Sequence, residues 1–215
     1  MQTVSLSHAV AMIPDGASLM IGGFMAVGSP VRMIDEIVRQ NKRNLTVIAN
    51  DSAAPGLGIG HLIAAKLVSK LIASHIGLNP ETQRQMLNDE MEVELVPQGT
   101  LVERIRAGGS GLGGVLTRTG VGTSVEPGKP HVEIAGVTYL VETALRADFA
   151  LIQAFLADHM GNLSYALTAR NFNPVMAMGA HTVIACADNV VPVGVIPPDH
   201  VITPAPLVDY LIGNP

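Results

Sequence analysis

The sequence is short of the residues on which several large classes of proteins depend. Its 215 residues include one Cys, no Trp and an aromatic share of only 3%. The single Cys, Cys186, cannot form a disulfide within the chain, which fits a reducing compartment and predicts a cytoplasmic protein. So few aromatic side chains argue against a platform on which nucleobases stack. The net charge of −5 argues against a basic face for nucleic-acid phosphates.

Charged residues and long apolar runs are scarce as well. Charged residues make up 14% of the chain and hydrophobic residues 48%, which excludes a disordered protein. With such a small polar coat, we expect another chain to cover part of the surface. The uncharged stretches 16–31 and 171–187 are interrupted by Gly, Pro or Asn, and a bilayer requires about 20 apolar residues. No membrane association and no signal peptide are therefore expected.

Short apolar runs alternate with helical patterns through the first half of the chain. The runs at 18–21, 45–49, 70–74 and 93–96 predict buried strands. Helices are predicted at 7–13, from Pro30 onward, and at 60–67, 80–89 and 100–107. This alternation favours an α/β protein with a mostly parallel sheet and helices on its faces.

The pattern changes after residue 107. Residues 108–122 include seven glycines, and we expect a mobile loop over a ligand or against a partner chain, with a surface loop of no role as the alternative. Ala135-Gly136 predicts a hairpin between strands at 132–134 and 137–141. Further strands are expected at 149–154, 163–165 and 182–185, and a closing helix at 204–212. Without a repeat or a linker, residues 1–215 are expected to form a single domain.

One glycine-rich stretch lies between a predicted strand and a predicted helix. It is the sequence GGFMAVGSP of residues 22–30. Backbone N–H groups and a helix N-terminus at such a place can hold an anion. The spacing matches neither G-x-G-x-x-G nor the P-loop, whose Lys is absent. An anion site and a tight turn without a ligand stand here as equal alternatives.

A catalytic nucleophile is not recognisable in the sequence. Ser110 lacks the G-x-S-x-G context, and Cys186 lies in an apolar run typical of a core residue. No H-E-x-x-H motif or Cys/His cluster indicates a metal site. The pairs Asp158-His159 and Asp199-His200 are expected at the surface. The chain therefore resembles a binding protein whose catalytic group comes from a partner.

Several motifs follow one another from about Asp15 toward the C-terminus. They are Asp15-Gly16, Leu19-Met20-Ile21, Gly22-Gly23-Phe24 with Gly28-x-Pro30, Asn50-Asp51, Pro97-Gln98-Gly99-Thr100-Leu101, Arg104-Ile105-Arg106-Ala107-Gly108-Gly109, Thr119-Gly120-Val121-Gly122-Thr123 and Ala169-Arg170-Asn171-Phe172-Asn173. In this order they resemble the α-subunit of the family I CoA-transferases. The acetate or butyrate:acetoacetate type is the most similar, and the 3-oxoacid and 3-oxoadipate enzymes are similar too.

The resemblance implies a fold and a reaction. The fold is a three-layer α/β/α sandwich with an open, mostly parallel sheet. The enzyme pairs this kind of α-subunit with a β-subunit, commonly as an A2B2 heterotetramer, and moves CoA between a short-chain acyl-CoA and a carboxylic acid by a ping-pong route. A glutamate attacks the thioester, giving an acyl anhydride and then a glutamyl-CoA thioester. In split enzymes the β-subunit holds that glutamate, so no catalytic residue is expected here, and CoA is a substrate rather than a tightly bound cofactor.

The resemblance also implies site residues. The CoA-contacting loop is assigned to Gly22, Gly23, Phe24, Met25, Ala26, Val27 and Gly28. Gly28→Val is expected to weaken CoA binding more than folding. Gln98 and Asn50 follow strand ends, where open α/β sheets bind ligands, and their amides can support the thioester or an oxyanion. An ordinary turn amide remains the alternative, narrowly favoured for Asn50.

Other interpretations of the same residues are kept open. Glu126 fits the bare E-x-G pattern around the family's nucleophile, but Pro127-Gly128 after it predicts a turn. A non-catalytic α/β regulator that binds a phosphorylated metabolite is the alternative to the enzyme. A self-sufficient sugar-phosphate isomerase would need an acid/base pair of its own, which the sequence does not offer.

Overall fold

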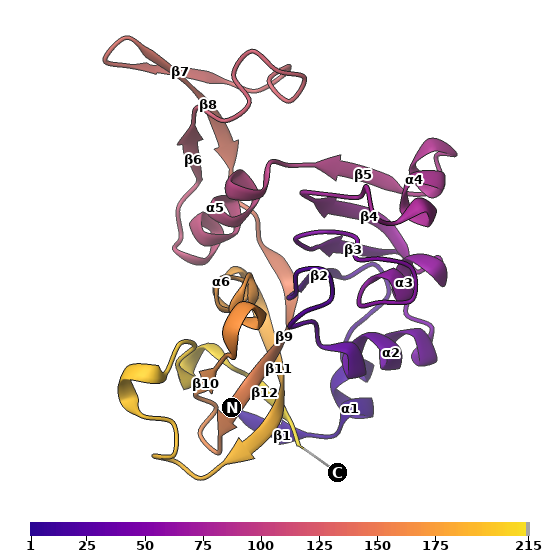
Figure 1. Cartoon of the computed structure of the whole chain (residues 1–215), viewed down its shortest axis with the longest axis vertical. Helices are drawn as coiled ribbons and strands as arrows, with labels where there is room; N and C mark the ends of the chain where they lie inside the picture. The colour runs from indigo at the N-terminus through magenta and orange to yellow at the C-terminus, as the bar shows by residue number, and fades with distance from the viewer. Residues whose placement is uncertain (214–215) are drawn as a thin grey trace.

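A computed structural model describes residues 1–213 as a large sheet with helices on both faces and a smaller sheet that stands apart (Figure 1). The strands are β1 (Gln2–Val4), β2 (Ser18–Ile21), β3 (Leu45–Ile48), β4 (Val68–Ala73), β5 (Glu92–Leu95), β6 (Gly114–Thr117), β7 (His131–Ile134), β8 (Val137–Thr143), β9 (Ala147–Asp158), β10 (Leu163–Ser164), β11 (Ala180–Val191) and β12 (Tyr210–Ile212). The α-helices are α1 (Leu6–Ala11), α2 (Val31–Gln40), α3 (Gly60–Ala64), α4 (Pro80–Leu87), α5 (Gln98–Gly109) and α6 (Asn173–Gly179), and short 3-10 helices are η1 (Leu167–Arg170), η2 (Pro198–His200) and η3 (Ala205–Leu207).

The large sheet is open and almost entirely parallel. Its strands follow the order β1-β12-β11-β9-β2-β3-β4-β5, and every pairing along this path is parallel. Only β10, beside β9, runs antiparallel. The expected α/β class with a mostly parallel sheet is therefore confirmed.

Alternate side chains of the strands pack into two separate cores, one on each face of the sheet. In β2, Leu19 and Ile21 pack into the core beneath α1–α4, while Met20 points to the opposite core with α5 and α6. In β9, Leu151 and Ile152 divide in the same way. Because both faces are covered, a central strand such as β2 is a nearly continuous apolar run, whereas the edge strand β5 alternates Glu with Val or Leu. The helix layers on the two faces complete the expected α/β/α sandwich.

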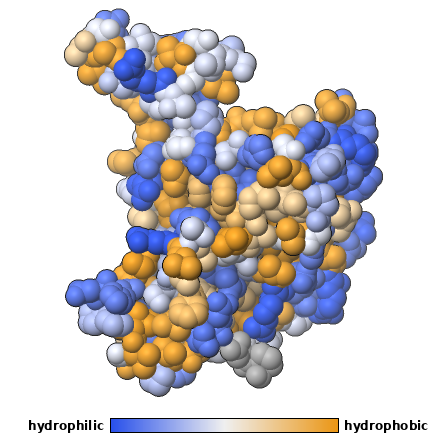
Figure 2. Space-filling model, viewed as in Figure 1, coloured by the Kyte–Doolittle hydropathy of each residue, from blue (hydrophilic) through white to orange (hydrophobic). Residues whose placement is uncertain are grey.

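The smaller sheet forms an arm, defined here as residues 112–143. Its strand order is β6-β8-β7, all antiparallel. The predicted hairpin is confirmed, with Ala135 and Gly136 both at positive φ, 50° and 73°, as a type I′ turn requires. Figure 2 shows the arm standing clear of the body with hydrophobic residues on its surface. Leu116, Val132 and Ile134 are among those exposed.

Three expectations from the sequence are wrong. Residues 204–212 do not form a closing helix, because β12 inserts between β1 and β11 after a single 3-10 turn. The stretch 108–122 is not one loop: its first two glycines end α5, and residues 114–117 pair with β8. Asp158 is not a surface residue but is 2% exposed, since its Oδ1 accepts the N–H groups of residues 160–162.

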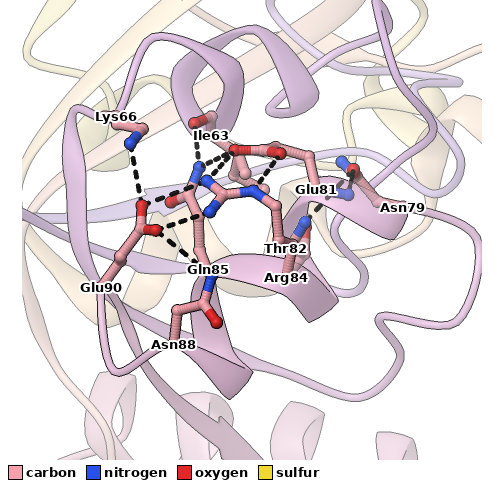
Figure 3. A network of polar contacts seen from close by, with 9 residues as sticks. All are labelled: Ile63, Lys66, Asn79, Glu81, Thr82, Arg84, Gln85, Asn88 and Glu90. Carbon is pink, nitrogen blue, oxygen red and sulfur yellow. Dashed lines mark hydrogen bonds and ion pairs between the residues drawn. The ribbon is translucent and has the colours of Figure 1, made fainter.

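A network of charges joins α3, α4 and the turn after α4, on the face opposite to α5 and α6 (Figure 3). The Arg84 guanidinium lies between Glu81, at 2.8 Å, and Glu90, at 2.5 Å. Its hydrogen bonds lower the pKa of each carboxyl to about 2. Nearby, Gln85 donates to the Ile63 carbonyl across the helix contact.

No helix among residues 1–213 has the length and apolar character needed to cross a membrane.

Candidate functional site

The carboxyl ends of the central strands meet where the strand order changes direction. From β2 the order runs through β3, β4 and β5 on one side, and through β9, β11 and β12 on the other. The glycine-rich stretch 22–30 leaves β2 at this point. Open parallel sheets bind ligands in the crevice outside such a point, so the topology marks this edge as the candidate site.

A pocket of about 400 Å³ opens at this edge. It is lined by Phe24, Asn50, Gln98, Val102, Thr168, Asn171 and Phe172. The fold therefore brings together three residues that the sequence singles out, although they lie up to 74 positions apart: Phe24, Asn50 and Gln98. The lining combines neutral amides with apolar walls and carries no ionisable side chain.

The predicted loop is a miniature hairpin. Phe24 and Val27 form an isolated antiparallel bridge, with N···O distances of 3.0 and 2.9 Å. Met25 and Ala26 form its tip, at φ values of 48° and 67°. Positive φ is uncommon for residues other than Gly, Asn and Asp. The tip directs Phe24 and Val27 outward, with exposed fractions of 47% and 49%, so the loop presents an apolar edge.

This hairpin changes the expected way of binding an anion. The N–H groups of Gly22, Gly23 and Met25 donate to Leu151 O, Asn171 Oδ1 and Asp51 Oδ2, and those of the Phe24–Val27 bridge are paired with each other. Within residues 22–28 of the described chain, only the N–H groups of Ala26 and Gly28 have no protein acceptor. The loop is thus no open cradle of backbone donors.

Gly28 is required where the loop returns to the body. Its φ is 76°, and a Cβ added there would lie 2.5 Å from the carbonyl oxygen of Ala169. Both the backbone conformation and the space exclude a side chain. Gly28 is therefore needed for the fold itself, whether or not the loop contacts a ligand.

Gln98 and Asn50 are directly connected. Gln98, at the start of α5, donates from Nε2 to Asn50 Oδ1 at 2.7 Å, and Asn50 Nδ2 lies 3.2 Å from Asp51 Oδ2. Asn50 is 1% exposed, whereas Gln98 is exposed at the pocket. The buried Asn50 side chain therefore contacts Gln98 directly, across 48 residues of sequence.

Three polar residues belong to the site although the sequence assigns them no role. Asp51 accepts from Met25 at the tip, Asn171 bonds Gly23 and Val27, and Asn173 donates to the Gly28 carbonyl at 2.9 Å. All three lie within motifs of the family resemblance. The only signal in the sequence was that resemblance, since no local pattern predicts contacts across 26 residues, as for Asp51, or more than 140, as for Asn171 and Asn173.

The groups with nucleophilic potential lie elsewhere. Burial raises the pKa of the Cys186 thiol to about 12, so this thiol stays protonated. Glu126 lies in the arm, where a hydrogen bond with His131 and another from the Gly122 N–H lower the pKa of its carboxyl. The Glu126–Lys129 backbone bond and the positive φ of Gly128 confirm the predicted turn. Neither residue lines the pocket.

Comparison with known proteins agrees with the family resemblance of the sequence motifs. The family model for coenzyme A transferase matches residues 3–214. The chain is 50% identical to the alpha chain of an acetate CoA-transferase of Escherichia coli strain K12, over 97% of this chain and 95% of that one. It is 52% identical to the alpha chain of an acetoacetyl-CoA:acetate/butyrate CoA transferase of Clostridium acetobutylicum, over 94% and 92%.

Solved structures share the fold. An acyl-CoA transferase from E. coli O157:H7 superposes with a TM-score of 0.89 at 24% identity, and this chain covers 47% of that longer chain. A variant of the decarboxylase AibA/AibB has a TM-score of 0.83 at 30% identity, and 84% of its chain is covered. The family model and the long, close relatives leave one conclusion: the chain belongs to the coenzyme A transferase family, as an α-subunit of its two-subunit members.

Proposed function

We propose that this chain is the α-subunit of an enzyme that moves CoA between a short-chain acyl-CoA and acetate, butyrate or acetoacetate. A partner β-subunit provides the glutamate nucleophile, and the two chains assemble as an A2B2 heterotetramer. The carboxylate of that glutamate attacks the thioester carbonyl, and the CoA thiolate leaves. The thiolate then attacks the glutamyl carbonyl of the resulting anhydride, which releases the first acid and leaves a glutamyl-CoA thioester for the second acid.

One observation carries this proposal. The pocket at the sheet edge offers amide donors, apolar walls and the hydroxyl of Thr168, but no carboxylate or other ionisable side chain that could attack a carbonyl or activate that hydroxyl. A pocket that can orient and polarise an acyl group, yet cannot react with it, fits one half of a divided active site. The exposed apolar edge of Phe24 and Val27 fits a surface that a partner and the substrate cover together.

The proposed roles follow from the geometry of the pocket. The loop from Gly22 to Gly28 contacts CoA with its apolar edge and with the N–H groups of Ala26 and Gly28. Gln98 donates from Nε2 to the carbonyl oxygen of the acyl group, because only one of its two N–H groups is used by Asn50. A neutral donor stabilises the charge that develops on that oxygen. Asn50 holds Gln98 in this orientation.

Further parts of the proposal concern the whole chain. Residues 1–215 act as a single domain, of which residues 214 and 215 lie outside the described part. CoA is bound as a substrate, and no cofactor is held tightly. The protein works in the cytoplasm and binds neither nucleic acid nor membrane.

Reconstitution tests the proposal. This chain and a co-purified partner are assayed alone and together for acetoacetate release from acetoacetyl-CoA plus acetate. We expect background turnover from each chain alone and full turnover from the mixture. Full activity of this chain alone would contradict the proposal. Failure to bind a partner, with tight binding of a phosphorylated metabolite instead, would favour the regulator.

A further inference from the structure

We propose that Asn171 is a positioning residue, which locks the Phe24–Val27 hairpin against the pocket wall and thereby sets where its apolar edge stands over Gln98. This inference rests on the proposed function. It adds a pocket-lining residue that acts on the reaction through the loop it holds, rather than by reacting with the acyl group or polarising it.

The Asn171 side chain holds both strands of the hairpin. Its Oδ1 accepts the Gly23 N–H at 3.1 Å, and its Nδ2 donates to the Val27 carbonyl at 2.9 Å. One amide therefore bonds both strands: it is the acceptor of the Gly23 N–H and a second donor to the Val27 carbonyl, which also accepts the Phe24 N–H. The contact joins segments about 148 residues apart in the sequence.

The same amide is anchored on its own side. Asn171 Oδ1 also accepts the Phe172 N–H, at 2.6 Å, and Nδ2 also donates to the Thr168 carbonyl, at 2.9 Å. A primary amide has two N–H donors and two acceptor lone pairs, so all of its capacity is used. No other neutral side chain of this size offers two donors and two acceptors, and a carboxylate would face two carbonyl oxygens.

The hairpin needs such a tie. Its tip places Met25 and Ala26 in the left-handed region, which is strained for residues other than Gly. Such a conformation persists only where surrounding contacts determine it. Asp51 holds the tip through the Met25 N–H at 2.9 Å, and Asn171 holds the two strands.

The tie acts on the pocket itself. Asn171 and its neighbours Thr168 and Phe172 line the same pocket as Phe24 and Gln98. A shift of the hairpin away from Asn171 therefore moves Phe24 relative to the amide of Gln98. Because a misplacement of about 1 Å can cost a hundredfold in rate, a small loosening of the hairpin has a large effect.

The first test compares the rate per working site. Asn171→Ala and the isosteric Asn171→Asp are assayed in the reconstituted complex, and active sites are counted from the CoA bound covalently to the partner. We expect kcat per counted site to fall by about ten- to a hundredfold, with KM for acetate nearly unchanged. Hydrogen exchange of the peptide 22–28 should become faster in both variants.

Asn162 is the matched control. It is also a half-buried Asn that ties two distant segments, with Nδ2 bonded to Asp158 and Oδ1 bonded to the Ala205 N–H, and it does not line the pocket. Asn162→Ala should lower the melting temperature and leave kcat per counted site unchanged. A merely structural role for Asn171 would give the same result as this control.

A rescue separates positioning from direct contact with substrate. Met25→Asn/Ala26→Gly gives the tip the residues that a type I′ turn prefers, so the hairpin needs its tie less. Added to Asn171→Ala, this change should restore most of kcat. Unchanged kcat per site in Asn171→Ala and Asn171→Asp, or a loss that the rescue leaves untouched, would overturn the inference. An inactive wild-type complex would instead contradict the proposed function.

Discussion

Two polar networks in this chain are built from different chemistry. Around the pocket, Asn50, Gln98, Asn171 and Asn173 hold backbone and one another through side-chain amides. At the α3–α4 corner, Arg84 joins carboxylates that remain in contact with water. An amide donates and accepts at once without adding a charge that would need its own partner in a half-buried site. Side-chain amides, together with the carboxylate of Asp51, thus fix the geometry around the pocket, whereas exposed charges contribute little to stability.

Breaking the amide network at Gln98 should have the largest effect. Losing one donor to a developing oxyanion costs roughly 10²–10³ in rate. Gln98→Ala should therefore lower kcat of the complex by that order and leave assembly intact. Gln98→Glu should be at least as damaging, because a carboxylate repels both the acid substrate and the nucleophile. Steady-state kinetics and size-exclusion chromatography measure the two properties.

Gln85 is the matched control for Gln98 from the other network. It is also a helical glutamine whose Nε2 donates to an oxygen, here the Ile63 carbonyl at 2.8 Å. Gln85→Ala should lower the melting temperature and leave kcat unchanged. If Gln98→Ala keeps more than about half of the wild-type kcat, far from the loss expected of an oxyanion donor, Gln98 serves only the fold at the start of α5.

Gly28→Val should damage folding and binding together. The sequence predicts a greater loss in CoA binding, but the Ala169 carbonyl oxygen lies 2.5 Å from the position of an added Cβ. Gly56 has a similar φ of 73° with open space around it, so Gly56→Val isolates the cost of the backbone, about 1–2 kcal/mol. Thermal melts should show the larger loss for Gly28→Val, and equal losses would contradict the role of the Ala169 contact.

Arg84→Gln should have the smallest effect. Hydrogen bonds from Arg84 lower the pKa of Glu81 and Glu90 from 4.5 to about 2. A carboxyl whose pKa is lower in the folded state stabilises the fold above its unfolded pKa. That contribution is lost as pH falls from 4.5 toward 2. Melting curves should separate wild type from variant at pH 7 and converge near pH 2, with equal kcat at neutral pH; a difference that persists at pH 2 would contradict this assignment.

Most strands, though not β1, β6 or β12, were predictable because local patterns determine them. The apolar runs of β2, β3 and β4 need no distant information, and the Ala135-Gly136 turn specifies its hairpin. The helix predicted at residues 204–212 was wrong, because pairing with β1 and β11 makes residues 210–212 a strand. Helix α6 is seven residues long and has no side-chain cap. No local pattern in the sequence therefore predicted it.

The site was predictable only in part. Strand ends pointed to Asn50 and Gln98, and the glycines pointed to the loop after β2. The bond between Gln98 and Asn50 spans 48 residues and that between Gly23 and Asn171 spans 148, so only the folded chain reveals them. The Phe24–Val27 hairpin could not be predicted, because its tip residues, Met25 and Ala26, are not those that a type I′ turn prefers.

The central claim is that the chemistry is divided between two chains. Mass measurement of each chain, after the complex is incubated with acetoacetyl-CoA and quenched, tests it most directly. We expect the partner to gain covalently bound CoA and this chain to keep its mass, in the wild type and in Glu126→Ala alike. CoA on this chain, lost on Glu126→Ala, would contradict the account.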